Sequence, residues 1–287
     1  MQLDCRRSGG ECQRCWLSGR QEIWYSTLTM SRLISIVNQK GGVGKTTTAV
    51  NVAGCLAAMD QRVLLVDLDP QGNASSGLGF DPQKEHAGLY ETLVLNEPLD
   101  RAIATYEPIQ YLHVVPATLN LAGANVDLVS IPEREFRLHN ALSGFRDRYD
   151  FIIVDNPPSL GLLTINGLAA ADEILIPVQC EYYALEGLSQ LLHTIELVQQ
   201  GLRPDIKILG AVMTMYDRRN QLSDAVFEEM YRYFPHRIFR SIIPRNVRLA
   251  EAPSYGKPIL LYDPLSKGAK AYARLAKEIL DTASYGS

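Results

Sequence analysis

The residues whose types and spacing suggest chemistry lie in one glycine-rich stretch, residues 38–48, which reads NQKGGVGKTTT. Its second half has the pattern in which a lysine and a hydroxyl residue close a phosphate-binding loop. Glycines let successive backbone N–H groups curl around an anion without clashes from Cβ atoms. Lys45 can reach the β- and γ-phosphates of a nucleotide, and the Thr46 hydroxyl can ligate Mg²⁺. The stretch therefore predicts a nucleotide site formed by Lys40, Gly41, Gly42, Val43, Gly44, Lys45, Thr46 and Thr47.

The start of this loop departs from the usual pattern G-x-x-x-x-G-K-[ST]. Gln39 stands where the first glycine belongs, and a second lysine, Lys40, follows it. This K-G-G-V-G-K-T form is the deviant Walker A motif. A glycine-rich turn that binds nothing is the weaker alternative.

Carboxylates follow two other apolar segments. Residues 62–69 predict a buried strand that ends in Asp67 and Asp69, whose alternation places both side chains on one face of the strand. Residues 149–155 end in Asp155 and match the Walker B pattern, in which the aspartate holds Mg²⁺ through a water or the loop hydroxyl. For either Asp67 or Asp69 alone, the alternative is a helix N-cap. The presence of both Asp67 and Asp69 beside a phosphate loop favours a functional role, because a doubly wound sheet binds its ligand at the carboxyl ends of its strands.

The elements that must position these residues alternate along the chain. Before the loop, residues 33–37 predict a buried strand, and after it residues 49–58 predict a helix packed on the sheet. Alternating strands and helices indicate an α/β fold, with a doubly wound, mostly parallel sheet flanked by helices. Further strands are predicted at 111–116, 174–178, 206–215 and 238–243, and further helices at 88–95, 99–106, 133–145, 184–200, 222–233 and 267–283.

Length and composition limit the organisation of the chain. Its 287 residues, 46% of them hydrophobic, suit a single P-loop domain over residues 30–287. Residues 1–29 show no helical or strand period, and we expect either a disordered extension or an upstream misreading of the start codon, with Met30 as the true start. Within this segment Cys12 and Cys15 could form half a zinc site, but unpaired thiols are the favoured interpretation because no second ligand pair follows.

Charge and hydropathy exclude other classes of protein. The net charge of −4 argues against a chain that is basic throughout, so any nucleic-acid binding needs a local patch. The sequence has no apolar run of about 18 residues and no signal-peptide core near its start, which leads us to expect a soluble, cytoplasmic protein without a membrane partner.

Residues 31–280 resemble the ParA/Soj chromosome- and plasmid-partitioning ATPases, a branch of the deviant Walker A group that includes MinD. The resemblance rests on NQKGGVGKTTT, VLLVDLDPQGN, DFIIVDNPPSLGLLTINGL, IPVQCEYYALEGLSQL and IPRNVRLAEAPSYGKPILLYD. The last two stretches are similar to the partitioning branch in particular. Asn156 is a small departure, because a threonine or cysteine is more usual there.

This resemblance implies a working cycle. ATP with Mg²⁺ would be sandwiched between two subunits of an ATP-dependent homodimer, with Lys40 reaching the partner's phosphates and Gly41 allowing the two loops to approach. Lys45 and Thr46 would act within their own subunit, Asp69 would position the attacking water, and Pro244 and Asn246 would contact the nucleotide base. The dimer would bind double-stranded DNA without sequence preference on the nucleoid, and a ParB-type centromere-binding protein would stimulate hydrolysis and release it.

The late part of the sequence gives independent support for DNA binding. Residues 214–260 hold eight cationic and five acidic side chains, which leaves a local charge of +3 in an acidic protein. A surface for phosphate backbones is expected there, and the candidate contacts are Arg219, Arg248 and, with weaker grounds, Arg245. Ordinary solvated arginines are the alternative.

Three rival functions remain to be compared. A MinD-like membrane-cycling ATPase would need a C-terminal amphipathic helix with a basic and an apolar face, and the sequence after residue 280 does not provide one. A nitrogenase-type iron–sulfur reductase would need paired cysteines, which Cys55 and Cys180 do not suggest. A nucleotide-binding scaffold without turnover is disfavoured by Asp69 and Asp155.

Overall fold

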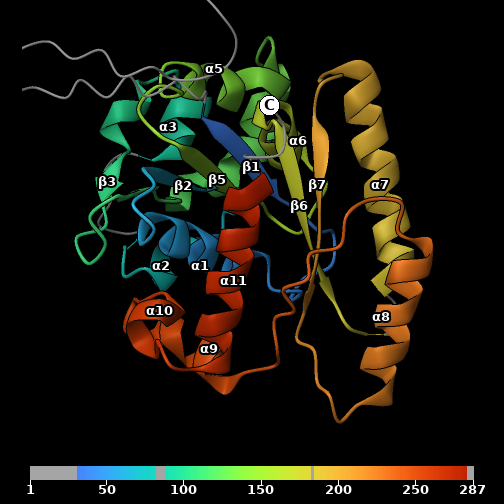
Figure 1. The fold of residues 1–287 in the computed structure, drawn as a ribbon. Coiled ribbons are helices and arrows are strands. Elements are labelled where there is room, and N and C mark those ends of the chain that lie inside the picture. Colours follow the sequence, from blue (N-terminus) through green and yellow to red (C-terminus); the bar gives the residue numbers. More distant parts are fainter. Residues whose placement is uncertain (1–30, 82–87, 182–183, 283–287) are drawn as a thin grey trace, which may run out of the picture.

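Seven strands in the described part of the chain form one sheet, in the order β3-β4-β2-β5-β1-β6-β7 (Figure 1). The computed structural model describes residues 31–81, 88–181 and 184–282. Each neighbouring pair is parallel except β3 and β4, which are antiparallel. The strands are β1 (Arg32–Ile36), β2 (Val63–Asp67), β3 (Ala104–Thr105), β4 (Leu112–Val115), β5 (Phe151–Asp155), β6 (Glu173–Gln179) and β7 (Lys207–Thr214). The predicted doubly wound, mostly parallel α/β fold is confirmed.

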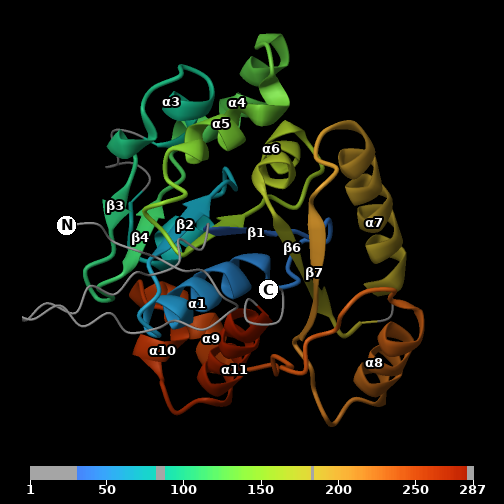
Figure 2. The same cartoon turned by 45° about the horizontal axis from the view of Figure 1, so that its top comes forward.

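Helices cover both faces of this sheet, because successive strand residues point to opposite sides. Leu64 and Val66 belong to one buried cluster, whereas Val63 and Leu65 belong to the other. The second cluster is covered by α1 (Lys45–Ala57), α2 (Asn73–Gly77), α9 (Val247–Glu251), α10 (Ile259–Tyr262) and α11 (Lys267–Thr282). The first is covered by α3 (Leu89–Leu93), α4 (Ala124–Asp127), α5 (Arg137–Ser143), α6 (Leu162–Ala170), α7 (Ala184–Gly201) and α8 (Gln221–Tyr233), and Figure 2 shows the two layers.

Two predicted elements were wrong in type. The helix expected over 99–106 is only a 3₁₀ turn, Leu99–Arg101, after which the chain turns into the edge strand β3. The strand expected over 238–243 forms isolated bridges beside β7 instead of a continuous ladder. The Phe239 and Ile243 amides donate to the carbonyl oxygens of Ala211 and Met213, so four positions of this segment span only two of β7 and a regular ladder cannot form. The Arg240 amide, between them, donates to Glu278 of α11 at 2.9 Å.

A smaller difference concerns residues 133–145, where the predicted helix starts late. Glu133 adopts a left-handed conformation with φ of 52°, and regular helix α5 begins only at Arg137, after a 3₁₀ turn. The predicted extension over residues 1–29 lies outside the described residues. Among the described helices, none combines the length and apolar character needed to cross a bilayer.

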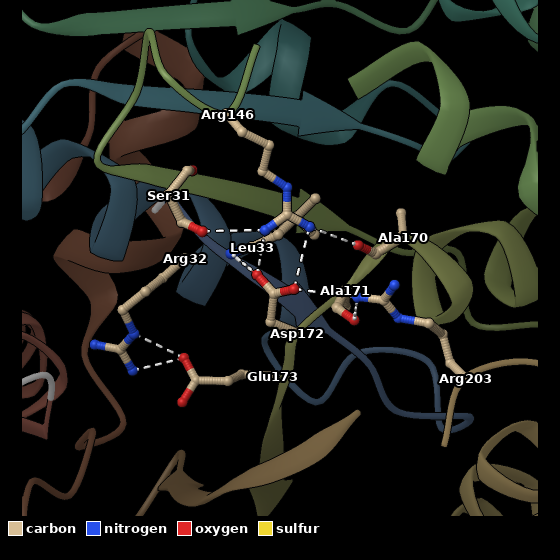
Figure 3. A network of polar contacts seen from close by, with 9 residues as sticks. All are labelled: Ser31, Arg32, Leu33, Arg146, Ala170, Ala171, Asp172, Glu173 and Arg203. Atoms are coloured by element: carbon tan, nitrogen blue, oxygen red, sulfur yellow. Dashed lines mark hydrogen bonds and ion pairs between the residues drawn. The ribbon is translucent and has the colours of Figure 1, made fainter. Parts of the chain in front are cut away.

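A polar network closes the edge of the sheet where β1 and β6 begin (Figure 3). Asp172 accepts hydrogen bonds from the Leu33 amide and from the guanidinium groups of Arg146 and Arg203. Beside it, Arg32 forms an ion pair with Glu173 at 2.6 Å and donates to the carbonyl oxygen of Ile279 in α11. The first strand, β6 and the last helix are therefore joined at the edge opposite to the carboxyl ends of the strands.

Candidate nucleotide-binding site

The glycine-rich loop connects β1 to α1 at the carboxyl edge of the sheet. Gly42 and Gly44 have φ of 75° and 90°, a region in which a Cβ atom is strained, and Gly44 is the residue that precedes α1. The Thr214 hydroxyl at the end of β7 donates to the Val43 carbonyl oxygen at 2.8 Å. The loop is thus held open at the N-terminus of a 13-residue helix, which is where backbone N–H groups attract a phosphate.

A cavity of about 590 Å³ lies against this loop. Its near wall is formed by residues of the loop and of α1, including Gly41, Gly42, Gly44, Lys45, Thr46 and Thr47. Asp69 lies on another wall, and so do residues of α2 and of the segment after α9. The volume is within the range of pockets that hold small-molecule ligands and cofactors.

Lys45 supplies a buried cation at the base of this cavity. The residue is 5% exposed, and Nζ donates to the carbonyl oxygen of Lys40 at 3.1 Å. Burial lowers the pKa of Lys45, while the nearby carboxylates of Asp155 and Asp69 act in the opposite direction. An anionic ligand would compensate the cost of burying this charge.

Asp155 at the end of β5 is fully buried, and neither carboxylate oxygen has a hydrogen-bond partner among the described residues. Burial raises its pKa well above the usual range, and Asp67 on the neighbouring strand raises it further. The nearby Thr46 hydroxyl acts in the opposite direction, although it does not come within hydrogen-bonding geometry of either carboxylate oxygen. Partnerless buried carboxylate oxygens beside a hydroxyl fit a hard divalent cation such as Mg²⁺.

Asp67 and Asp69 do not share the role that their alternation suggested. Asp67 is the last residue of β2, and its carboxylate accepts hydrogen bonds from the Ser75 hydroxyl at 2.6 Å and the Ser75 amide at 2.8 Å. Burial raises the pKa of Asp67 to about 6. Asp69 lies in the loop after the strand and lines the cavity, with one oxygen accepting from the Gln71 amide. Asp67 therefore joins the end of β2 to α2, whereas Asp69 lines the cavity.

The two residues expected to contact the nucleotide base, Pro244 and Asn246, do not line the cavity of the described structure. Met215 and Leu249 are among the residues that do line it. Asn246 uses its side chain to cap α9, accepting from the Arg248 amide at 2.8 Å. Met215 has φ of 53°, an unusual conformation for a residue with a side chain, and no sequence signal indicates it.

Lys40 is the loop residue whose environment the sequence did not suggest. Its ammonium group forms an ion pair with Glu181, just after β6, with Nζ–Oε2 at 2.9 Å. The two residues are 141 positions apart in the chain. In the single chain, Lys40 is therefore held by its own subunit.

The candidate DNA contacts lie on two adjacent segments. The Arg245 amide donates to the Tyr216 carbonyl oxygen at 3.0 Å, which brings the region around Arg219 next to that of Arg245. Arg219 is 90% exposed and paired with Asp217, and its hydrogen bonds lower the pKa of that carboxyl to about 2. Arg248, at the start of α9, pairs with Glu251 at 2.8 Å. The three arginines are accessible, and two carry a carboxylate partner.

Comparisons with known proteins agree with this geometry. The model of a family described as AAA domain matches residues 31–208. The chain is 56% identical to the chromosome partitioning protein ParA of Myxococcus xanthus, covering 88% of this chain and 89% of that protein. It is 55% identical to the sporulation initiation inhibitor protein Soj of Bacillus subtilis, with coverage of 87% and 98%. A crystal structure of cobyrinic acid a,c-diamide synthase from Mycobacterium smegmatis, with an ATP analogue and magnesium bound, is 37% identical, with a TM-score of 0.79 and coverage of 90% and 97%.

Proposed function

Because this chain belongs to the ParA/Soj family of partitioning ATPases, we propose that it segregates DNA through a cycle of ATP-dependent dimerisation, DNA binding and hydrolysis. The observation that carries the proposal is the cavity that has the buried Lys45 cation at its base and the partnerless carboxylate of Asp155 beside it. A triphosphate with Mg²⁺ supplies the charges that these two groups require.

Within one subunit, each group of the site has a distinct task. Lys45 and the loop amides would bind the β- and γ-phosphates, while Thr46 and Asp155 would hold the metal, Asp155 through a water or the loop hydroxyl. A bound Mg²⁺ would neutralise negative charge that develops on the phosphates. Asp69 orients the attacking water, since it lies in the loop after β2 and lines the cavity. Pro244 and Asn246 remain the proposed base contacts.

Across the dimer, Lys40 reaches the phosphates bound by the partner subunit. Gly41 permits the two loops to approach, because its hydrogens point into open space: a Cβ built there meets no atom within 4 Å in the single chain. Arg219, Arg248 and Arg245 then contact DNA phosphates without reading sequence. A ParB-type protein stimulates hydrolysis, and the protein works on the nucleoid in the cytoplasm.

The rivals are less well supported. The apolar side of α11, which includes Leu275 and Ile279, is buried against α1 and so does not provide a membrane-binding face. Burial raises the thiol pKa of both Cys55 and Cys180 to about 12, which disfavours thiolate ligation of an iron–sulfur cluster.

One experiment separates these possibilities. ATP turnover is measured with Mg²⁺ alone, with double-stranded DNA, and with DNA plus a ParB-type protein from the same genome; parallel sedimentation follows binding to DNA and to anionic vesicles. We expect slow turnover that DNA and the partner raise together, and ATP-dependent sedimentation with DNA only. Sedimentation with vesicles but not with DNA would support the MinD-like alternative.

A further inference from the structure

The ion pair between Lys40 and Glu181 involves the one loop lysine that the proposed cycle sends to another subunit. Both side chains are partly exposed, Lys40 at 38% and Glu181 at 44%, so the pair lies at the surface of the loop. In its own subunit the ammonium group is 2.9 Å from Glu181 Oε2. Lys40 has to break this contact before it can reach a partner's phosphates.

Glu181 is itself fixed in position. Its second carboxylate oxygen accepts a hydrogen bond from the Gln179 side chain, and its backbone amide donates to the Gln179 carbonyl oxygen at 2.8 Å. Both carboxylate oxygens are therefore engaged, one by β6 and one by Lys40. A carboxylate oriented in this way loses less side-chain freedom when it forms the pair than a free surface glutamate does.

The backbone of Lys40 is anchored separately from its side chain. Its amide donates to Asn38 Oδ1 at 2.9 Å, and Asn38 in turn donates to the Pro177 carbonyl oxygen in β6 at 2.7 Å. The Lys40 carbonyl oxygen accepts from Lys45. Because these contacts do not involve the ammonium group, the side chain can leave Glu181 while the loop keeps its shape.

We propose that Glu181 is a positioning residue that retains Lys40 in its own subunit and so restrains dimer assembly. The inference rests on the proposed function, since the restraint matters only if Lys40 acts across the dimer. A triphosphate bound in the partner carries more negative charge than one carboxylate and so outcompetes it at contact distance. Glu181 then sets how readily two ATP-bound subunits associate, and it has no effect once they are joined.

The test compares Glu181→Gln with the parent protein in the presence of a slowly hydrolysed ATP analogue and Mg²⁺. Association and dissociation are followed separately, by stopped-flow mixing of labelled subunits and by dilution of the dimer. We expect association about two- to fivefold faster, the range that a partly exposed ion pair allows, with dissociation unchanged. The difference should shrink as salt is raised, because salt weakens the pair in the parent only.

Glu107→Gln is the matched control. Glu107 is an exposed residue in the turn between β3 and β4, and the substitution changes net charge by the same amount without touching Lys40. We expect parental association and dissociation rates from it. Equal acceleration in both variants would attribute the effect to net charge and contradict the proposal.

A second measurement examines the ion pair without a dimer. The rate at which an amine-specific reagent modifies Lys40 in the monomer, read by mass spectrometry, should rise in Glu181→Gln and stay unchanged in Glu107→Gln. An unchanged association rate in Glu181→Gln would contradict the proposal that Glu181 restrains dimer assembly. A faster dissociation rate would also contradict it, because it would show that Glu181 stabilises the dimer. A parent protein that binds ATP but forms no dimer would contradict the proposed function itself, whatever the labelling of Lys40 shows.

Discussion

Asp67 and Asp155 lie directly opposite each other, as the paired last residues of the neighbouring strands β2 and β5. Both carboxyl groups are fully buried, but only Asp67 has hydrogen-bond donors, which Ser75 provides. Two carboxylates so close together cannot both be charged at low cost. Two buried acids therefore share the carboxyl edge of the sheet, and this predicts how stability depends on pH and on the Mg²⁺ that we propose binds there.

The first prediction concerns Asp67→Asn. The pKa of Asp67 is raised to about 6, above the value of 3.8 in an unfolded chain, so the native state holds this proton more tightly. The stability that the protonated Asp67 contributes is fully present below about pH 3.8 and is lost as the pH rises through about 6. Asparagine does not titrate, and the variant should gain up to about 3 kcal/mol relative to the parent between pH 4 and 7. Urea unfolding without Mg²⁺ tests this; a difference that is constant with pH would contradict it.

The second prediction concerns Asp155→Asn. Without metal, the variant should be at least as stable as the parent, because it removes a buried acid whose oxygens have no partner. With ATP, the added stabilisation that Mg²⁺ gives the parent should disappear. Thermal unfolding with ATP is measured in Mg²⁺ and in a chelator, and an undiminished Mg²⁺ effect in the variant would remove Asp155 from the metal site.

The third prediction separates binding from hydrolysis. Lys45→Ala and Thr46→Ala should weaken Mg-ATP binding by about 10- to 100-fold, the cost of losing a hydrogen bond to a charged group. Asp69→Ala should bind ATP normally, lose about 100-fold or more in turnover, and accumulate as a dimer, because only the water-orienting group is lost. Equal losses of ATP affinity in all three variants would refute this division of roles.

The fourth prediction addresses the dimer. Gly41→Val should fold and bind ATP, since a Cβ at this position meets no atom within 4 Å in the single chain, but it should not dimerise. Lys40→Ala should also bind ATP as a monomer and neither dimerise nor hydrolyse. Sedimentation velocity with a slowly hydrolysed ATP analogue distinguishes the outcomes, and a normal dimer in either variant would count against the sandwich arrangement.

The fifth prediction addresses DNA. Arg219→Ala and Arg248→Ala should each weaken DNA binding by the ATP-trapped dimer, with Arg245→Ala expected to have the smaller effect. Each lost phosphate contact should reduce the slope of log affinity against log salt by roughly one unit, equally on two unrelated duplexes. ATP binding and dimer formation serve as controls. Unchanged affinity in both variants would place the DNA surface elsewhere.

Much of the site could be predicted from sequence because its parts are local. The turn of the glycine-rich loop, the apolar strands and the aspartates at their ends are each encoded within about ten neighbouring residues. What sequence could not supply depends on distant partners. The amide of Arg240 is taken by Glu278, Lys40 is paired with Glu181, and Met215 is held in a left-handed conformation by the tertiary structure. No local pattern contains that information.

The place of β1 between β5 and β6 has a consequence for synthesis on the ribosome. The strand that leads into the loop emerges early, yet its neighbours in the sheet are made much later: Ile34 pairs with Ile153 on one side and Glu173 on the other. Asn38, at the base of the loop, is anchored to Pro177, 139 residues further along. A nascent chain therefore exposes the apolar residues of β1 until most of the domain has been translated. The loop therefore acquires this anchor only after β6 has left the exit tunnel.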